Sequence, residues 1–214
     1  MGSFVTEDNK VYTLIIKHYE DCLEKFGDSH LGVDWPNEKD AETRYRVMVE
    51  VIRDPGEKVS LLDFGCGAAH LYEYISNFGL TGIEYSGLDI SRKFIELCRK
   101  KFPSLNFLEV DILENPENVP EFDYIVMNGV FTEKRELSYN DMLDYFKKLI
   151  RAVFEKAKKG IAFNVMSKHV DWEREDLFHL SFDELGSFLK EEISRNFTIR
   201  NDYGLYEYTV YIYK

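Results

Sequence analysis

The chain has few cysteines and no long apolar run, and each shortage excludes a class of protein. Three cysteines occur in 214 residues, and Cys22, Cys66 and Cys98 stand far apart without CxxC or Cys/His spacing. This argues against a disulfide framework and a structural zinc site. No basic region precedes an apolar run at the N-terminus, and no run approaches the roughly 20 residues of a membrane span. We therefore expect a cytoplasmic protein without a signal peptide or membrane segment.

Positive charge is also scarce. The chain has 27 Lys and Arg residues against 39 Asp and Glu residues, a formal net charge of -12. The densest basic stretch is Arg99-Lys100-Lys101, too short for the basic face with which proteins displace counterions from phosphate. We expect neither nucleic-acid nor membrane partners. A content of 44% hydrophobic and 31% charged residues is typical of a folded globular chain.

Two patterns divide the sequence. Residues 1–54 contain two apolar stripes at helical spacing, which predict helices at 11–26 and 38–53, with Asn37 as N-cap of the second. We interpret this part as an N-terminal helical cap on the same domain. Residues 55–214 instead alternate short apolar strands with amphipathic helices, and form the predicted core.

The core predicts an α/β fold, a doubly wound sheet of seven mostly parallel strands. Its strands are expected at residues 59–64, 85–90, 105–110, 123–130, 160–165, 197–200 and 208–213. Helices are expected at residues 68–78, 91–102, 140–158 and 181–193. No helix separates the last two strands, so they should pair as a C-terminal antiparallel hairpin. Ligands of such sheets bind beyond the carboxyl ends of the strands.

Acidic residues and a glycine turn mark those strand ends. The turn is Asp63-Phe64-Gly65-Cys66-Gly67, where the missing side chains let a ligand approach the backbone of a helix N-terminus. Asp89 ends the second strand, where a carboxylate can hold ribose hydroxyls. Asp111 ends the third, beside Ile112, and Ile90 and Ile112 can pack an adenine ring. Three such acids suit a cationic sulfonium nucleoside, whereas Asp63 would repel a pyrophosphate.

These motifs resemble the class I S-adenosylmethionine (SAM)-dependent methyltransferase family over residues 59–214. The resemblance implies that Asp63 and the turn with Gly65, Cys66 and Gly67 surround the methionine part of SAM. It further implies that Asp89 and Ile90 bind the ribose side and Asp111 and Ile112 the adenine. Asn128-Gly129, at the end of the fourth strand, would flank the donor methyl and the acceptor. The product would be S-adenosylhomocysteine (SAH).

The sequence departs from the family pattern at one glycine. Ala69 stands where the third glycine is usual, a small departure because alanine needs little extra room. A nicotinamide dehydrogenase is the rival interpretation. Its glycine fingerprint, however, needs a glycine where this chain has His70, and that fingerprint has no acidic residue before its first glycine, whereas this chain has Asp63.

Two residues of the cap are candidates for the site. Trp35 is expected either to form a lid wall over the acceptor or to pack against the core. Arg44 is expected either to reach the carboxylate of the donor as a bidentate fork or to stay solvated.

Candidates for the acceptor side follow the later strands. Phe131 and Glu133 follow Asn128, where amino-directed methyltransferases carry an Asn-Pro-Pro-aromatic stretch, although both prolines are absent here. Glu133 and the loop residue His169 are the candidate general bases, against the alternative that both are solvated. Tyr203 is a candidate acceptor contact or a packing residue.

The sequence thus predicts methyl transfer from SAM to a small molecule through a hydroxyl, amine or thiol. The alternatives are methylation of a protein or nucleic acid, and a non-catalytic SAM-binding protein. We expect no metal site, and the oligomeric state stays open.

Overall fold

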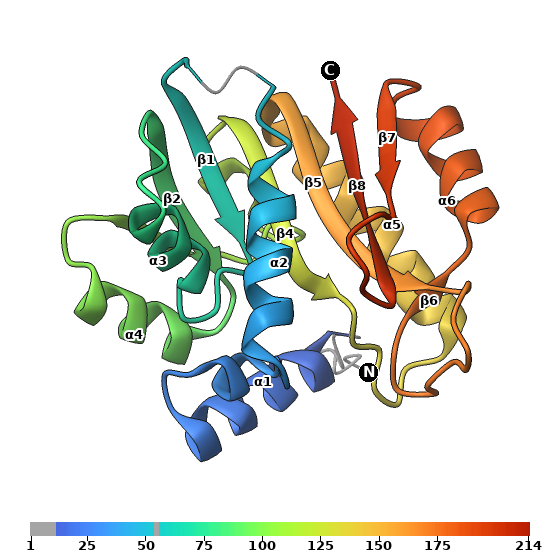
Figure 1. Ribbon diagram of the computed structural model, residues 1–214, viewed down its shortest axis with the longest axis horizontal. Helices are drawn as coiled ribbons and strands as arrows, with labels where there is room; N and C mark the ends of the chain where they lie inside the picture. The colour runs from blue at the N-terminus through green and yellow to red at the C-terminus, as the bar shows by residue number, and fades with distance from the viewer. Residues whose placement is uncertain (1–11, 54–55) are drawn as a thin grey trace, which may run out of the picture.

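The computed structural model describes residues 12–53 and 56–214, and its centre is one mixed sheet (Figure 1). The strand order is β3-β2-β1-β4-β5-β8-β7, and β6 pairs with β5 at its side. The strands are β1 (Val59–Phe64), β2 (Ile83–Asp89), β3 (Asn106–Glu109), β4 (Phe122–Phe131), β5 (Ala157–Ser167), β6 (His179–Leu180), β7 (Phe197–Arg200) and β8 (Glu207–Tyr213). Only β8 runs antiparallel to its neighbours β5 and β7, and the other pairs are parallel.

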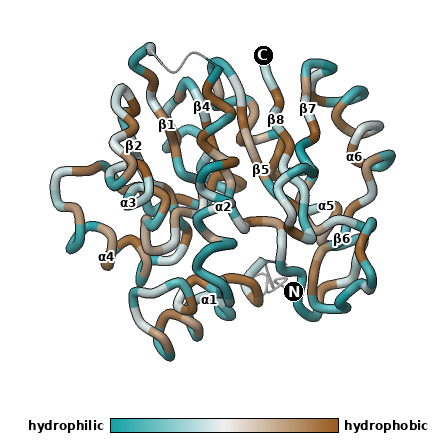
Figure 2. The backbone as a smooth tube through the Cα atoms, viewed as in Figure 1, coloured by the Kyte–Doolittle hydropathy of each residue, from teal (hydrophilic) through white to brown (hydrophobic). Residues whose placement is uncertain are grey.

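Each central strand is buried on both faces, and its alternate side chains enter two different cores. In β4, Ile125 and Met127 belong to one apolar cluster, whereas Tyr124 and Val126 belong to the other. Successive residues of a strand point to opposite faces, so a continuous apolar run suits a sheet that helices cover on both sides. Figure 2 shows the hydrophobic segments along the central strands and hydrophilic ones on the outer helices.

Helices cover both faces, as the alternating pattern predicted. The helices are α1 (Thr13–Phe26), α2 (Glu38–Val49), α3 (His70–Asn77), α4 (Arg92–Lys101), α5 (Tyr139–Lys156) and α6 (Phe182–Phe188). Three short turns of helix complete them: η1 (His30–Val33), η2 (Pro116–Asn118) and η3 (Leu189–Ile193). Buried residues of α2, α3 and α4 join one core, and those of α5 and α6 join the other.

The first helix of the predicted cap, α1, lies across the carboxyl ends of the strands, whereas α2 packs on one face of the sheet. In Figure 1, α1 passes below the arrowheads of β1 and β4. Side chains of α1 hold it there: Ser91 Oγ donates to Glu20 Oε1 at 2.6 Å, and Tyr19 Oη donates to the Gly129 carbonyl at 3.2 Å. The Asn37 side chain caps α2, as predicted. The predicted boundary between residues 54 and 55, like residue 11 of the first predicted helix, lies outside the described residues.

The predicted fold class is confirmed, with one addition. All seven expected strands are present, and β7 and β8 form the antiparallel hairpin. The two-residue β6 was not predicted, because so short a strand cannot show the alternation that identifies one. Among the described residues, no helix is both long and apolar enough to span a membrane.

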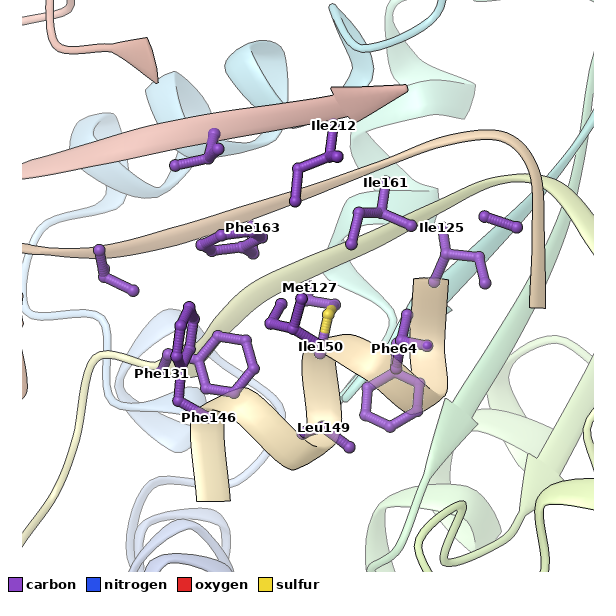
Figure 3. Close-up of a cluster of buried hydrophobic side chains, with 14 of the residues drawn as sticks. Phe64, Ile125, Met127, Phe131, Phe146, Leu149, Ile150, Ile161, Phe163 and Ile212 are labelled. Carbon is purple, nitrogen blue, oxygen red and sulfur yellow. The ribbon is translucent and has the colours of Figure 1, made fainter. Parts of the chain in front are cut away.

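Phe131 offers a test of the core. Its ring is fully buried and packs edge-to-face on Phe146, 4.8 Å away, and Phe163, 5.9 Å away (Figure 3). We expect Phe131→Ala to lower the free energy of unfolding by about 3–5 kcal/mol in urea titration, because it empties a packed site. Trp172, which is 69% exposed, is the control, and Trp172→Ala should change stability by less than about 0.5 kcal/mol. Equal losses would contradict this packing.

Candidate active site

A cavity lies between α1 and the carboxyl ends of β1, β2, β3 and β4. We call it the first cavity. The structure brings together here all the residues that were predicted to contact the cofactor except Arg44. They are Asp63, Gly65, Cys66, Gly67, Asp89, Ile90, Asp111, Ile112, Asn128 and Gly129. Residues that the sequence placed at four separate strand ends therefore line one cavity.

The glycine turn has the conformation for which glycine was expected. Gly65 and Gly67 have φ angles of +73° and +50°, a region that other residues adopt only with strain. A Cβ on Gly65 would lie 2.7 Å from Val130 Cγ2. Ala69 also has a positive φ, +59°. The alanine therefore costs backbone strain, on the order of 1 kcal/mol. The sequence had indicated only that its side chain needs little extra space.

Asp89 closes the turn onto the second strand. Its Oδ2 accepts the Gly67 N–H at 3.0 Å and its Oδ1 accepts the Ser91 N–H at 2.8 Å. Because these bonds use one lone pair of each oxygen, the carboxylate keeps acceptor capacity toward the cavity.

Two buried carboxyls give the first cavity its electrostatic character. Burial raises the pKa of Asp63 to about 7, against a hydrogen bond from Tyr85 Oη at 2.8 Å that lowers it. Burial likewise raises the pKa of Asp89 to about 6, against backbone N–H donors that lower it. Asp89 also raises the pKa of Asp63 through charge repulsion. A cation in this cavity would favour the charged form of both groups.

The end of β4 has a buried hydrogen-bond acceptor without a donor among the described residues. Asn128 Oδ1 is buried, and no described residue donates to it. The next residue, Gly129, donates its N–H to Asn164 Oδ1 at 2.7 Å. Gly129 has a φ of +83°, and a Cβ there would lie 2.8 Å from Trp35 Cζ2. This glycine therefore allows Trp35 to pack directly on the strand end.

Helix α1 supplies site residues that the sequence did not suggest. Tyr12, Ile15 and Tyr19 line the first cavity, and Tyr12 Oη donates a hydrogen bond to Asp111 Oδ2. The apolar stripe of this helix was visible in the sequence, but the surface that it covers depends on how the cap folds back over the sheet.

A second cavity adjoins the first. It is bounded by the cap, the end of β4, the loop after β5 and the start of β8. Tyr19 and Trp35 line both cavities, so they form the wall between them. Trp35 therefore has the lid-wall position that was one of its two predicted alternatives, although it also packs against buried residues of the core.

Arg44 lies in the second cavity and not in the first. Its Nε donates to Glu207 Oε2 at 2.8 Å, and its guanidinium stacks 4.2 Å from the Trp35 ring. Glu207 Oε1 in turn accepts from Asn164 Nδ2 at 2.8 Å. A buried carboxylate from β8 thus takes the bond that was predicted for the carboxylate of the donor, so Arg44 orients Trp35 instead.

Glu133 is the candidate base that the structure places in the second cavity. Its side chain is 9% exposed, and its Oε2 accepts from Arg135 at 3.2 Å. Burial raises the pKa of the Glu133 carboxyl, and the Arg135 hydrogen bond opposes that rise. At neutral pH a carboxylate with a raised pKa is a better proton acceptor than a solvated one.

Three other predicted residues lie elsewhere. His169 is exposed and packs on Phe182, outside both cavities, although later residues of its loop line the second cavity. Phe131 is fully buried in the core, since it falls on the same side of β4 as Ile125 and Met127. Tyr203 lines neither cavity, and its hydroxyl hydrogen-bonds with Thr209 Oγ1 at 2.9 Å. Its neighbour Tyr206 and the loop residue Trp172 line the second cavity instead.

Comparison with known proteins supports the family that the motifs resemble. Residues 62–160, from β1 to the start of β5, match a family described as a methyltransferase domain. Over 165 residues the chain is 24% identical to a Mycobacterium tuberculosis protein named as a methyltransferase, a match that covers 76% of this chain and 98% of that protein.

Solved structures agree on the fold. The SAM-bound magnesium protoporphyrin IX methyltransferase of Synechocystis PCC 6803 superposes with a TM-score of 0.66 at 13% identity, covering 97% of this chain and 99% of that one. SAM-bound human N-acetylserotonin methyltransferase gives 0.65 at 14% identity, covering 96% and 59%. With the strand order and the glycine turn, these matches show that the chain has the class I methyltransferase fold, and that its part from β1 to the start of β5 resembles a methyltransferase domain.

Proposed function

We propose that this methyltransferase binds SAM in the first cavity and methylates a small molecule held in the second. The observation that carries the proposal is the shared lining of Tyr19 and Trp35, where the carboxylate-rich cavity adjoins one that contains a candidate base. Methyl transfer requires the donor methyl and the acceptor atom to meet where the two cavities adjoin, and binding both molecules there fixes their orientation, which supplies much of the rate of a displacement.

The charged, polar and apolar groups that line the first cavity match the groups of SAM. Asp63 and Asp89 are buried carboxyls whose charged forms a cationic ligand would stabilise. Asn128 Oδ1 is a buried acceptor that could bind a donor such as the ammonium group of the methionine part. Asp89 keeps lone pairs for ribose hydroxyls, and Ile90 and Ile112 give apolar surface for the adenine. The bound cofactor supplies an electrophilic methyl group on a positively charged sulfur.

Charge in the second cavity restricts the acceptor. Its lining has five carboxylates, Asp34, Asp40, Glu133, Asp171 and Glu207, against two guanidiniums. Both guanidiniums have carboxylate partners, since Arg44 pairs with Glu207 at 2.8 Å and Arg174 with Asp176 at 2.5 Å. No unpaired cation of the described lining can therefore hold a phosphate or carboxylate group. We infer a neutral or cationic acceptor, a hydroxyl compound or an amine.

Within this site Glu133 takes the acceptor proton. It is buried in the lining of the cavity where the acceptor would lie, next to Thr132. We assign the base role to Glu133 rather than His169 because a base must reach the proton that it removes. A cytoplasmic setting stays a prediction of the sequence.

Asp89 is the first test of the cofactor site. We expect Asp89→Asn to weaken binding of both SAM and SAH by about 10- to 100-fold in calorimetric titration, because it removes hydrogen bonds to a charged acceptor. Glu109 is the matched control, since it ends the neighbouring strand β3 in register with Asp89 but lines neither cavity. Glu109→Gln should leave both affinities unchanged. Similar losses in the two variants would contradict the role of Asp89.

The raised pKa values of Asp63 and Asp89 predict a pH dependence of binding. Below about pH 6 both carboxyls are protonated and cannot attract a cation, whereas above about pH 7 both are charged. SAH affinity should therefore increase from pH 5 to pH 7.5, with protons released on binding at the lower end of this range. Titrations in buffers of different ionisation enthalpy count those protons. An affinity that does not change with pH would contradict the buried-acid account.

Glu133 and His169 can be separated by mutation. Once an assay of neutral and cationic small molecules has identified an acceptor, Glu133→Gln should lower kcat by at least about 100-fold, as expected for loss of a general base. SAH binding should stay within about twofold, because Glu133 lines the other cavity. His169→Gln should leave kcat unchanged. A large loss in the His169 variant, with none in the Glu133 variant, would reverse the assignment.

The proposed function itself is tested by SAH formation. We expect SAH to form from SAM only when a neutral or cationic small molecule is present. Tight SAM binding without turnover over a broad panel of small molecules would favour a binding protein. Turnover only with a protein or nucleic acid would move the acceptor out of the second cavity.

A further inference from the structure

Three potential metal-binding side chains converge where α1 meets η1. They are His18 and Cys22 of α1 and Asp34, which follows η1. The ligand atoms of all three, one nitrogen, one sulfur and one carboxylate oxygen, lie within 4.8 Å of one another. The sequence did not predict this group, because no Cys/His spacing marks it and Asp34 reaches it only through the fold of the cap.

The fold brings the three ligand atoms close to one another. His18 and Cys22 are four residues apart on a helix, so they share one face. His18 Nε2 lies 2.7 Å from Asp34 Oδ2 and 3.9 Å from Cys22 Sγ, so the same nitrogen faces both other donors. Asp34 has a left-handed backbone conformation, with φ of 58°. That conformation carries strain in a non-glycine residue.

A second His–Asp pair in the chain shows what an ordinary pair looks like. His70 Nε2 lies 2.9 Å from Asp28 Oδ1. The Lys101 ammonium also contacts this carboxylate, 2.8 Å from Oδ2, so a cation already balances its charge. In the group of His18, the third partner is a thiol instead of an ammonium. The two pairs thus differ in their third partner, Lys101 in one and Cys22 in the other, and only the cysteine can bind a metal ion.

Access and neighbouring charge also suit a cation. The side chains of His18 and Asp34 are 20% and 35% exposed, so an ion can enter from solvent. Nearby Glu133 adds negative charge, whereas Arg135 is held by Glu133 at 3.2 Å and Asp176 at 3.5 Å. A mixed nitrogen, sulfur and oxygen donor set favours Zn²⁺ over Mg²⁺ or Ca²⁺, which prefer oxygen alone.

We propose that His18, Cys22 and Asp34 form a Zn²⁺ site with water as the fourth ligand. The His18 nitrogen, the Cys22 thiolate and one Asp34 oxygen supply three ligands of a tetrahedral ion. The site ties the loop of η1 to α1. Because Asp34 directly precedes Trp35, the metal fixes the residue that forms the wall between the two cavities.

Cobalt binding by the full chain is the test, after treatment with a chelator and with a thiol-free reductant. Co²⁺ should produce a thiolate-to-metal charge-transfer band in the near ultraviolet, and Zn²⁺ should remove it by displacement. Cys22→Ser should abolish the band. His18→Gln and Asp34→Asn should weaken Zn²⁺ affinity at least about tenfold, and asparagine tolerates the left-handed conformation at position 34. Circular dichroism shows whether each variant is folded.

Controls make the result decisive. Cys98→Ser, at a buried cysteine elsewhere, should keep the band, and His70→Gln should leave Zn²⁺ affinity unchanged. Absence of the band in the unmodified chain, or its persistence in Cys22→Ser, would overturn the proposal. So would equal losses of Zn²⁺ affinity in His18→Gln and His70→Gln. None of these measurements uses a methyl donor, so failure here would not count against the proposed methyl transfer.

Discussion

Two carboxyl groups buried at one edge of the sheet set the constraint on which the rest of the site depends. Asp63 and Asp89 lie within the protein, and burial raises the pKa of each despite the hydrogen bonds that they accept. Burying a carboxylate is costly unless a positive charge compensates it. A cationic ligand provides that compensation, and the glycine turn between the two strands leaves the space for it. Under the proposed function, the acids that are costly to bury in the free chain are therefore the ones that select the cofactor.

The cap converts this binding edge into a site with two compartments. Helix α1 covers the strand ends and places Tyr19 beside Gly129, while the loop that follows places Trp35 there. Trp35 is held from the other side by Arg44, which Glu207 of β8 fixes in turn. The wall between donor and acceptor thus depends on contacts among the cap, β4 and the C-terminal hairpin. Under the proposed function, the acidic lining of the second cavity then restricts which acceptors can enter.

Much of the sheet and its ligand edge could be predicted from the sequence, because both depend on local periodicity. Apolar runs identified the strands, and the rule for parallel sheets placed Asp63, Asp89 and Asp111 together. Phe131 was missed although the same alternation assigns it to the core face with Met127. Arg44 was not predictable, because its partner Glu207 is 163 residues away in the sequence. Loop residues such as His169 follow no period, so only the folded chain shows where they point.

A crystal structure of the chain with SAH is the most direct test of the central claim. The account predicts the nucleoside in the first cavity, with its ribose hydroxyls on Asp89 and its ammonium group near Asp63 and Asn128. Its sulfur should face the wall formed by Tyr19 and Trp35. SAH bound elsewhere, or bound in this cavity with its ammonium group turned away from both buried acids, would contradict the account.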